Sequence, residues 1–178
     1  MTANVPVVDT ARLRLRGHRL EDLDACGAMW SDPVVTRFIG GHPSSPQQTW
    51  ARLLGYVGHW SVLHFGYWAI EEKATAAFVG EIGFADFKRD IAPSMKDVPE
   101  LGWALAAHAH GKGYATEAAR AAVAWGDETF DAKRTVCLIG PDNLASLRVA
   151  AKSGYEVFER ADFNARPTLF LERKTPSR

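Results

Sequence analysis

The sequence has few cysteines and no excess of charge of either sign. Cys26 and Cys137 are its only cysteines among 178 residues, and 21 basic residues balance 21 acidic ones. A framework of several disulfides is therefore excluded, and a reducing, cytoplasmic location is expected. Because the net charge is zero, we expect neither nucleic acid nor an anionic membrane surface as a partner.

Long apolar runs and repeats are also missing. No window of 18 apolar residues occurs, and the N-terminal stretch MTANVPVVDTARLRLR lacks an apolar core of signal-peptide length. We therefore expect no membrane-spanning segment and no export by that route. The chain has no low-complexity tract, and its 47% hydrophobic and 24% charged residues are typical of a globular protein. This predicts one domain over residues 1–178.

Periodicity predicts a mixed α+β fold with one strand-helix-strand crossover near its centre. Alternation of apolar and polar residues, or short apolar runs, predict strands at 12–16, 66–71, 78–87, 99–105, 135–139, 155–159 and 168–173. Apolar residues at helical spacing predict helices at about 20–30, 44–60, 113–130 and 143–153. The polar stretch 88–98 is expected to be a long hairpin loop. Glu117 and Arg120, three residues apart on the third helix, are expected to form a solvated pair.

Two glycines separated by one lysine open the third predicted helix. Gly111 and Gly113 cost backbone entropy and add no packing, which favours a role outside the core. The spacing does not fit a P-loop, and a dinucleotide fingerprint would need Gly or Ala where Thr116 stands. Two interpretations remain: an anion site made of backbone N–H groups at the helix start, or a tight turn without a ligand.

Several motifs together resemble a known family. His110-Gly111-Lys112-Gly113-Tyr114-Ala115 is similar to the acetyl-CoA pyrophosphate loop of the GNAT N-acetyltransferases, and the segment from Asn143 to Tyr155 is similar to their second motif. ARLRLR, ELGW and GKGYATEA also follow the order of the RimJ/RimL branch, whose members acetylate ribosomal-protein N-termini. The resemblance implies a single GNAT domain, with a mostly antiparallel sheet of six or seven strands, a splayed central parallel pair and about four helices.

The resemblance also implies how acetyl-CoA would bind. The pantetheine arm and thioester oxygen would contact the main chain near Trp103 and Leu105, and Asn143 would hydrogen-bond the arm. The pyrophosphate would contact the loop and helix start, formed by His110, Gly111, Lys112, Gly113, Tyr114, Ala115 and Thr116. His110 replaces the Gln or Arg of the general pattern, so either its ring or only its backbone would contact phosphate. His108 and His110 lack a visible third ligand, so no metal is expected.

Two residues are predicted to take part in the chemistry. Glu100, in the ELGW-like position, is the expected base for the amine, with Glu81 or a water as alternatives. Many GNAT enzymes place a tyrosine where Ala150 stands, whereas the resembling branch has a serine at the position of Ser146. Because a serine hydroxyl is a very weak acid, Ser146 is expected to hydrogen-bond the departing thiolate rather than to protonate it.

The acceptor is the least determined part of the function. An α-amine titrates at about 7.7 to 8.0 and a lysine at about 10.4, so an α-amine is deprotonated at lower cost. This favours a protein or peptide N-terminus over a small-molecule amine, and a non-catalytic acyl-CoA-binding module is a third possibility. The acceptor wall would come from aromatic residues of the first two helices, although sequence does not separate wall from core: Trp30, Phe38, Trp50, Tyr56 and Trp60. Oligomeric state is not predicted.

Overall fold

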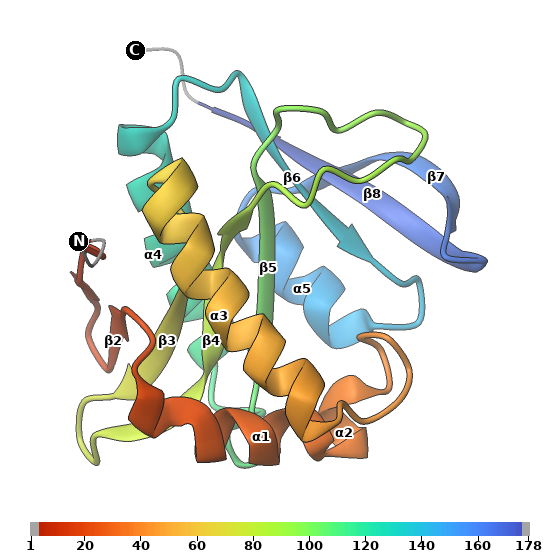
Figure 1. Cartoon of the computed structure of the whole chain (residues 1–178). Helices are drawn as coiled ribbons and strands as arrows, with labels where there is room; N and C mark the ends of the chain where they lie inside the picture. The colour runs from red at the N-terminus through yellow and green to blue at the C-terminus, as the bar shows by residue number, and fades with distance from the viewer. Residues whose placement is uncertain (1–3, 176–178) are drawn as a thin grey trace.

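The central element of the fold is one eight-stranded sheet. The computed structural model describes residues 4–175, and its strands lie in the order β1-β2-β3-β4-β5-β6-β8-β7 (Figure 1). All neighbouring strands are antiparallel except β5 and β6, which are parallel. The strands are β1 (Val8–Asp9), β2 (Leu13–Arg16), β3 (Tyr67–Glu72), β4 (Ala77–Ala85), β5 (Glu100–Leu105), β6 (Arg134–Ile139), β7 (Glu156–Phe163) and β8 (Arg166–Lys174).

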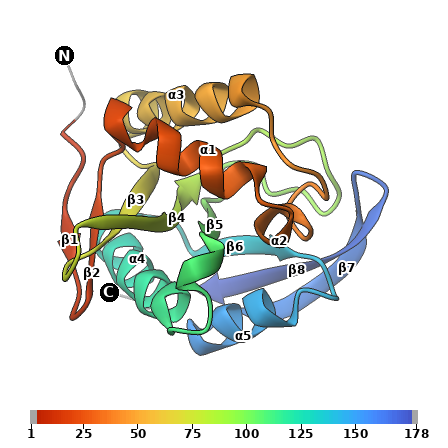
Figure 2. The same ribbon diagram turned by 90° about the horizontal axis from the view of Figure 1, so that it is seen from below.

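Helices cover both faces of this sheet. Helices α1 and α3 lie on one face, and α4 and α5 lie on the other (Figure 2). The helices are α1 (Leu23–Ser31), α2 (Pro33–Thr36), α3 (Pro46–Leu63), α4 (Tyr114–Thr129) and α5 (Leu144–Lys152), with 3-10 turns η1 (Leu20–Asp22) and η2 (Ala107–Ala109). None of the helices within residues 4–175 is both long enough and apolar enough to cross a membrane.

Local sequence explains where the long helices begin and how closely they pack. Ser45 caps α3 and forms a capping box with Gln48, while Pro46 occupies the first turn. Along α4, Ala118, Ala119 and Ala122 are fully buried, and their small side chains let the helix approach the sheet closely. This approach brings the glycine-rich start of α4 next to the ends of the central strands.

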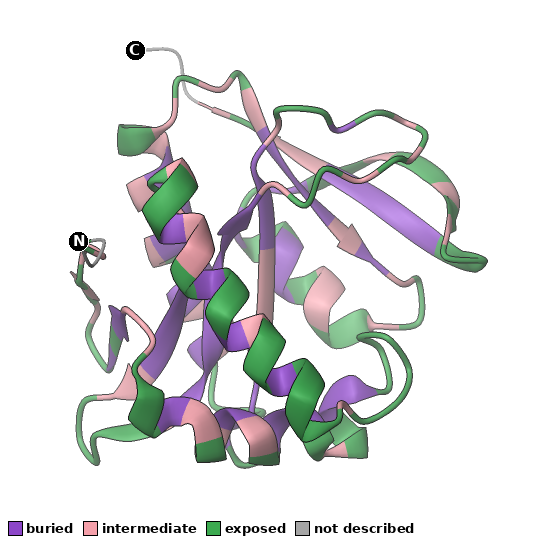
Figure 3. Cartoon of the chain, in the orientation of Figure 1, coloured by how far each residue is buried: buried purple, intermediate pink, exposed green. Residues whose placement is uncertain are grey.

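The main core lies between the sheet and α4, and it includes Trp60 from α3. Strands β3, β4 and β5 are buried almost throughout (Figure 3). The rings of Trp60 and Trp68 meet edge to face at 4.9 Å, and Trp68 meets Trp125 at the same distance. Burial of each large apolar side chain contributes about 1.5–3 kcal/mol. The sheet is therefore a rigid platform for the residues at its strand ends.

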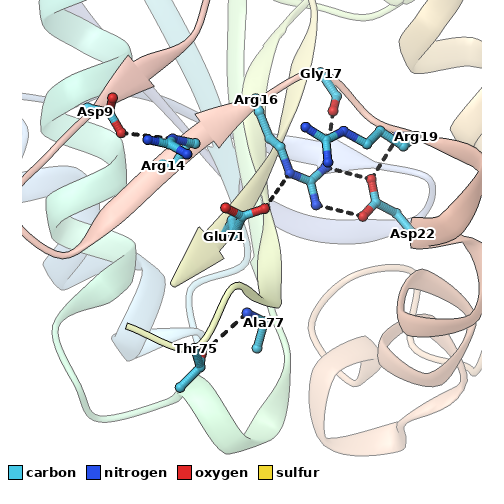
Figure 4. A network of polar contacts seen from close by, with 9 residues as sticks. All are labelled: Asp9, Arg14, Arg16, Gly17, Arg19, Asp22, Glu71, Thr75 and Ala77. Carbon is cyan, nitrogen blue, oxygen red and sulfur yellow. Dashed lines mark hydrogen bonds and ion pairs between the residues drawn. The ribbon is translucent and has the colours of Figure 1, made fainter. Parts of the chain in front are cut away.

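A buried ion-pair network joins β2 to the turn that starts α1. The Arg16 guanidinium donates to both carboxylate oxygens of Asp22 at 2.8 Å, and its Nε donates to Glu71 on β3 at 2.7 Å (Figure 4). Asp22 also accepts from the backbone N–H of Arg19. Burial raises the pKa of the Asp22 carboxyl, but the bonds from Arg16 and Arg19 outweigh it and lower that pKa overall. The network fixes where α1 starts relative to the sheet.

The predicted fold class is confirmed, with more elements than expected. Seven strands and four helices were predicted at about their observed places, but β1 and α2 were missed because two and four residues are too short to show periodicity. Strand β7 extends to Phe163, four residues beyond the prediction. The polar stretch 88–98 does connect β4 to β5, and it is anchored by Met95, which is buried against Val136 and Phe170.

Candidate active site

The loop before α4 offers a row of unpaired backbone donors. Gly111 and Gly113 adopt φ values of +75° and +80°, a left-handed conformation that favours glycine. Within the described chain, no hydrogen bond is formed by the amides from Gly111 to Thr116. A Cβ added to Gly111 would meet nothing within 4 Å, so the space beside the loop is open. The turn can therefore receive an anion at the positive end of the α4 dipole.

Arg12 braces this loop from β2's side of the sheet. Its guanidinium donates to the carbonyl oxygen of Lys112 at 2.9 Å and pairs with Glu117 at 2.7 Å. The expected pair between Glu117 and Arg120 is therefore wrong: Arg120 donates to the carbonyl of Lys152 instead. Sequence spacing within one helix missed this contact because Arg12 is 105 residues away along the chain.

The side chains of His110 and Tyr114 are turned away from the loop. The ring Nε2 of His110 lies 2.8 Å from the carbonyl oxygen of Leu105, and because a carbonyl only accepts, Nε2 is the donor. The hydroxyl of Tyr114 donates to Glu72 on β3. Of the two interpretations of His110, this geometry favours the one in which only its backbone would face a phosphate. The ring instead fastens the loop to the end of β5.

The two parallel strands part just beyond their shared end. Strands β5 and β6 have one register pair, Glu100 with Val136, and the amide of Val136 donates to Pro99 at 3.1 Å. A cavity of about 1210 Å³ extends from this wedge to the face covered by α3. Its walls come from the segment after α2, from α3, from β4 and β5, from the start of α5 and from the β7–β8 hairpin.

The cavity collects some of the predicted site residues and not others. Glu100, Trp103, Asn143 and Ser146 line it, whereas Leu105 and the stretch from His110 to Thr116 do not. Asn143 caps α5, its Oδ1 accepting from the amide of Ser146 at 3.1 Å. The Ser146 hydroxyl has no hydrogen-bond partner among the residues described, so it can donate into the cavity.

The structure also shows which of the five predicted aromatic residues line the cavity and which do not. Trp30, Phe38 and Tyr56 line the cavity. Trp60 is 4% exposed and belongs to the main core, and Trp50 is 41% exposed outside the cavity. Helical periodicity placed four of the five on the first two predicted helices, with Phe38 between them, but the direction of each ring depends on contacts with other elements.

Both oxygens of Glu100 are already engaged. Arg89, from the loop after β4, donates to them through Nε at 2.8 Å and through its second terminal nitrogen at 2.9 Å. The arginine is itself held by contacts with the rings of Phe87 and Phe163. A bidentate pair of this kind is strong and directional. Any proton acceptance by Glu100 would have to compete with Arg89.

Glu81 lies deeper and keeps one oxygen free. Its Oε1 accepts from Trp30 Nε1 at 3.1 Å and from the Tyr56 hydroxyl. Its Oε2 has no hydrogen-bond partner among the described residues and lies 3.6 Å from Nε2 of His18. Burial first, and the Glu81 charge second, raise the pKa of the Tyr56 hydroxyl, which therefore remains a donor.

Cys26 completes a cluster of three residues of the kinds that bind metal ions. Ligand atoms of His18, Cys26 and Glu81 lie within 4.8 Å of one another. Burial, followed by the charge of Glu81, raises the pKa of the Cys26 thiol to about 12. This thiol is therefore protonated at neutral pH.

Tyr67 is a cavity residue that the sequence did not single out. Its ring stacks on Tyr56 with centroids 4.5 Å apart, and both rings lie on the α3 side of the sheet. The hydroxyl occupies the space above Gly102, where a Cβ would overlap it. Burial, and then the charges of Glu100 and Glu81, raise the pKa of this hydroxyl. The only sequence signal was Gly102 itself, since glycine inside a strand marks a close approach.

The family resemblance predicted a wedge between two parting parallel strands and a glycine-rich helix start with amides available to an anion. The structure contains both features. A family model described as "Acetyltransferase (GNAT) domain" matches residues 12–156. The chain therefore belongs to the GNAT acetyltransferase family, and it is an N-acetyltransferase.

Relatives support this assignment over the whole chain. The uncharacterized protein YkkB of Bacillus subtilis is 32% identical and covers 98% of this chain and 99% of its own. The uncharacterized N-acetyltransferase p20 of Bacillus licheniformis is 26% identical, over 79% of this chain and 76% of its own. An acetyltransferase structure from Agrobacterium tumefaciens has a TM-score of 0.82 and 28% identity, covering 95% of this chain and 94% of its own.

Two more distant structures, each 16% identical, share the fold. RimL, a ribosomal alpha-N-protein acetyltransferase solved with coenzyme A, has a TM-score of 0.77 and covers 95% of this chain and 98% of its own. The aminoglycoside acetyltransferase AAC(6')-Ib, also solved with coenzyme A, has a TM-score of 0.74 and covers 91% of this chain and 94% of its own. The same fold thus serves two kinds of acceptor.

Proposed function

We propose that this protein transfers the acetyl group of acetyl-CoA to the α-amine of a protein or peptide N-terminus, by direct attack in a ternary complex. Two observations carry the proposal: the amides from Gly111 to Thr116, at the start of α4, have no partner among the described residues, and a cavity is lined by both β5 and β6. The donors suit the pyrophosphate, and the cavity gives the pantetheine arm a route to an acceptor. The two buried, free thiols agree with a reducing, cytoplasmic location.

The chain's own groups would hold acetyl-CoA in a fixed position. The amides of the glycine loop bind the pyrophosphate, and Arg12 keeps the loop in shape through Lys112. Main-chain groups near Trp103 and Leu105, on the edge of β5 that faces β6, hold the arm and the thioester oxygen. The amide nitrogen of Asn143 is left for the arm, because its oxygen caps α5. When bound, acetyl-CoA supplies an acetyl group activated as a thioester.

For the base, the geometry favours Glu81 over Glu100. Glu81 is a cavity residue, and its buried Oε2, 3.6 Å from Nε2 of His18, has no hydrogen-bond partner among residues 4–175, whereas both oxygens of Glu100 accept from Arg89. Glu81 takes the proton of the attacking amine as the carbon–nitrogen bond forms and the carbon–sulfur bond breaks. Ser146 donates a hydrogen bond to the departing thiolate. Glu100 is the second candidate, acting through water after Arg89 shifts.

Several observations support an α-amine acceptor. Neutralising a lysine at pH 7 costs roughly 3.5 kcal/mol more than neutralising an α-amine, at 1.36 kcal/mol per pKa unit. The ordered motifs of the RimJ/RimL branch and the fold shared with RimL agree with this class. The fold shared with AAC(6')-Ib keeps a small-molecule amine as the second candidate. No metal takes part in the proposal, so turnover is expected to be insensitive to EDTA.

CoA release would be measured against a panel of N-terminal peptides and a panel of small amines. Turnover confined to the amine panel would refute the peptide acceptor, and tight acetyl-CoA binding without any turnover would indicate a non-catalytic binding module. Glu81→Gln is expected to lower kcat by about 100-fold, the typical contribution of a positioned base. If Glu100→Gln has that effect and Glu81→Gln does not, the assignment of the base is reversed.

A further inference from the structure

The cavity is lined by more arginines than are paired with carboxylates in the described part of the chain. Four arginines line the cavity: Arg37, Arg52, Arg89 and Arg166. Arg89 is paired with Glu100. The other three have no carboxylate partner within ion-pair distance in the part of the chain that the structure describes. Two histidines, His42 and His59, line the same space.

The acidic groups of the cavity do not cancel this charge. Besides Glu100, only Glu81 and Asp142 are acidic among the lining residues. Glu81 is 1% exposed and accepts from Trp30 Nε1, whereas Arg52 lies over the face of the same ring; the two residues form no ion pair among the described residues. Asp142 lies next to Asn143, at the start of α5 and beside the wedge. The acceptor half of the cavity is therefore left with three unneutralised guanidinium groups.

One of these guanidinium groups is held in place by the protein, and a second lies close to a loop. Arg52 lies over the Trp30 ring at 3.7 Å and donates to the Ser44 hydroxyl at 3.3 Å, which leaves its other N–H groups available. The Arg166 side chain lies against Gly41, in the loop after α2. A Cβ added to Gly41 would be 2.6 Å from one of the terminal nitrogens of Arg166. Ordered guanidinium groups bind carboxylates at lower entropic cost than free ones.

We propose that the acceptor carries one or more carboxylates close to its reactive amine, as in a peptide with acidic residues directly after its N-terminus, and that Arg37, Arg52 and Arg166 bind them. This inference rests on the proposed function and names its substrate class. It also separates the protein from enzymes that act on polycationic aminoglycosides, because a second cation in this cavity would meet like charge. Charge complementarity of this kind chiefly sets selectivity and association rate.

The test uses three peptides that share an N-terminal serine and an amidated C-terminus. The two residues after the serine are Asp and Glu in the first peptide, Asn and Gln in the second, and Lys and Arg in the third. Free glutamate and its diamide are compared in the same way as small-molecule acceptors with and without carboxylates. We expect kcat/KM to fall about tenfold from the acidic to the neutral peptide and again to the basic one, with smaller steps at 0.5 M salt. Arg37→Gln and Arg166→Gln should each raise KM for the acidic peptide about fivefold relative to KM for the neutral peptide.

Arg160→Gln is the matched control, because Arg160 is exposed on β7 and does not line the cavity. Equal kcat/KM for the three peptides would overturn the inference while leaving N-acetylation intact. A rise in KM for acetyl-CoA in the arginine variants would also overturn it, by assigning these groups to the cofactor. If no amine is acetylated, the proposed function fails, and calorimetric titration of the acidic and basic peptides still decides the charge preference.

Discussion

Replacing Gly102 by alanine tests how the cavity floor is packed. An added Cβ would overlap the Tyr67 hydroxyl and lie 3.2 Å from the ring carbon that carries it. Because the Tyr67 ring is buried and stacked on Tyr56, it has to move, which costs about 1–3 kcal/mol for overpacking and about 0.5–1.5 kcal/mol for the lost stacking. We expect Gly102→Ala to lower the free energy of unfolding by about 3 kcal/mol. For a chain of this length that is a fall in Tm of roughly 6–12 °C.

The assay is thermal and urea unfolding of a double-mutant cycle. Tyr67→Phe removes the overlapping atom, so the variant with both changes should regain most of the stability lost by Gly102→Ala alone. Gly58→Ala is the control, since a Cβ there meets nothing within 4 Å and alanine favours a helix by up to about 1 kcal/mol. Strictly additive effects of Gly102→Ala and Tyr67→Phe would refute the assigned overlap.

Three further changes test the parts around the site. Asp22→Asn should lower the free energy of unfolding by about 3 kcal/mol at pH 7, because it leaves Arg16 buried without its main partner. The folded pKa of Asp22 is lowered, so this stability is present above the unfolded pKa of about 3.9 and is lost as pH falls through the folded pKa. Urea unfolding should therefore show the difference in stability between wild type and variant shrinking in acid. Gly113→Ala should cost about 1 kcal/mol, from its φ of +80°, and should weaken acetyl-CoA binding by calorimetry; unchanged affinity would argue against the amide cradle. Cys26 and Cys137 should not react with a thiol reagent at pH 8 until the protein is denatured, because burial raises the pKa of both thiols; rapid modification of the native protein would contradict their placement.

Contacts between distant segments set the limit of what the sequence could predict at the site. Glu100 was the expected base because it is the first residue of the ELGW motif. Arg89, which donates to both of its oxygens, comes from a loop that has no recognisable sequence pattern. The pairing of Glu117 with Arg12, rather than with Arg120, has the same origin. Tyr67 was not predicted because tyrosine is common in strands. Its hydroxyl lies where a side chain at position 102 would be, and only the glycine at that position leaves room for it.

The sequence by itself determined the features that depend on neighbouring residues. Strand alternation, helix caps at Ser45 and Asn143, and the glycines that permit a left-handed turn at 111 and 113 are all local properties of the backbone. Tertiary structure alone decided which aromatics line the cavity, which carboxylate keeps a free oxygen and which arginines lack a partner. These depend on distances between segments far apart in the chain, and such distances are fixed only when the sheet and its helices pack together.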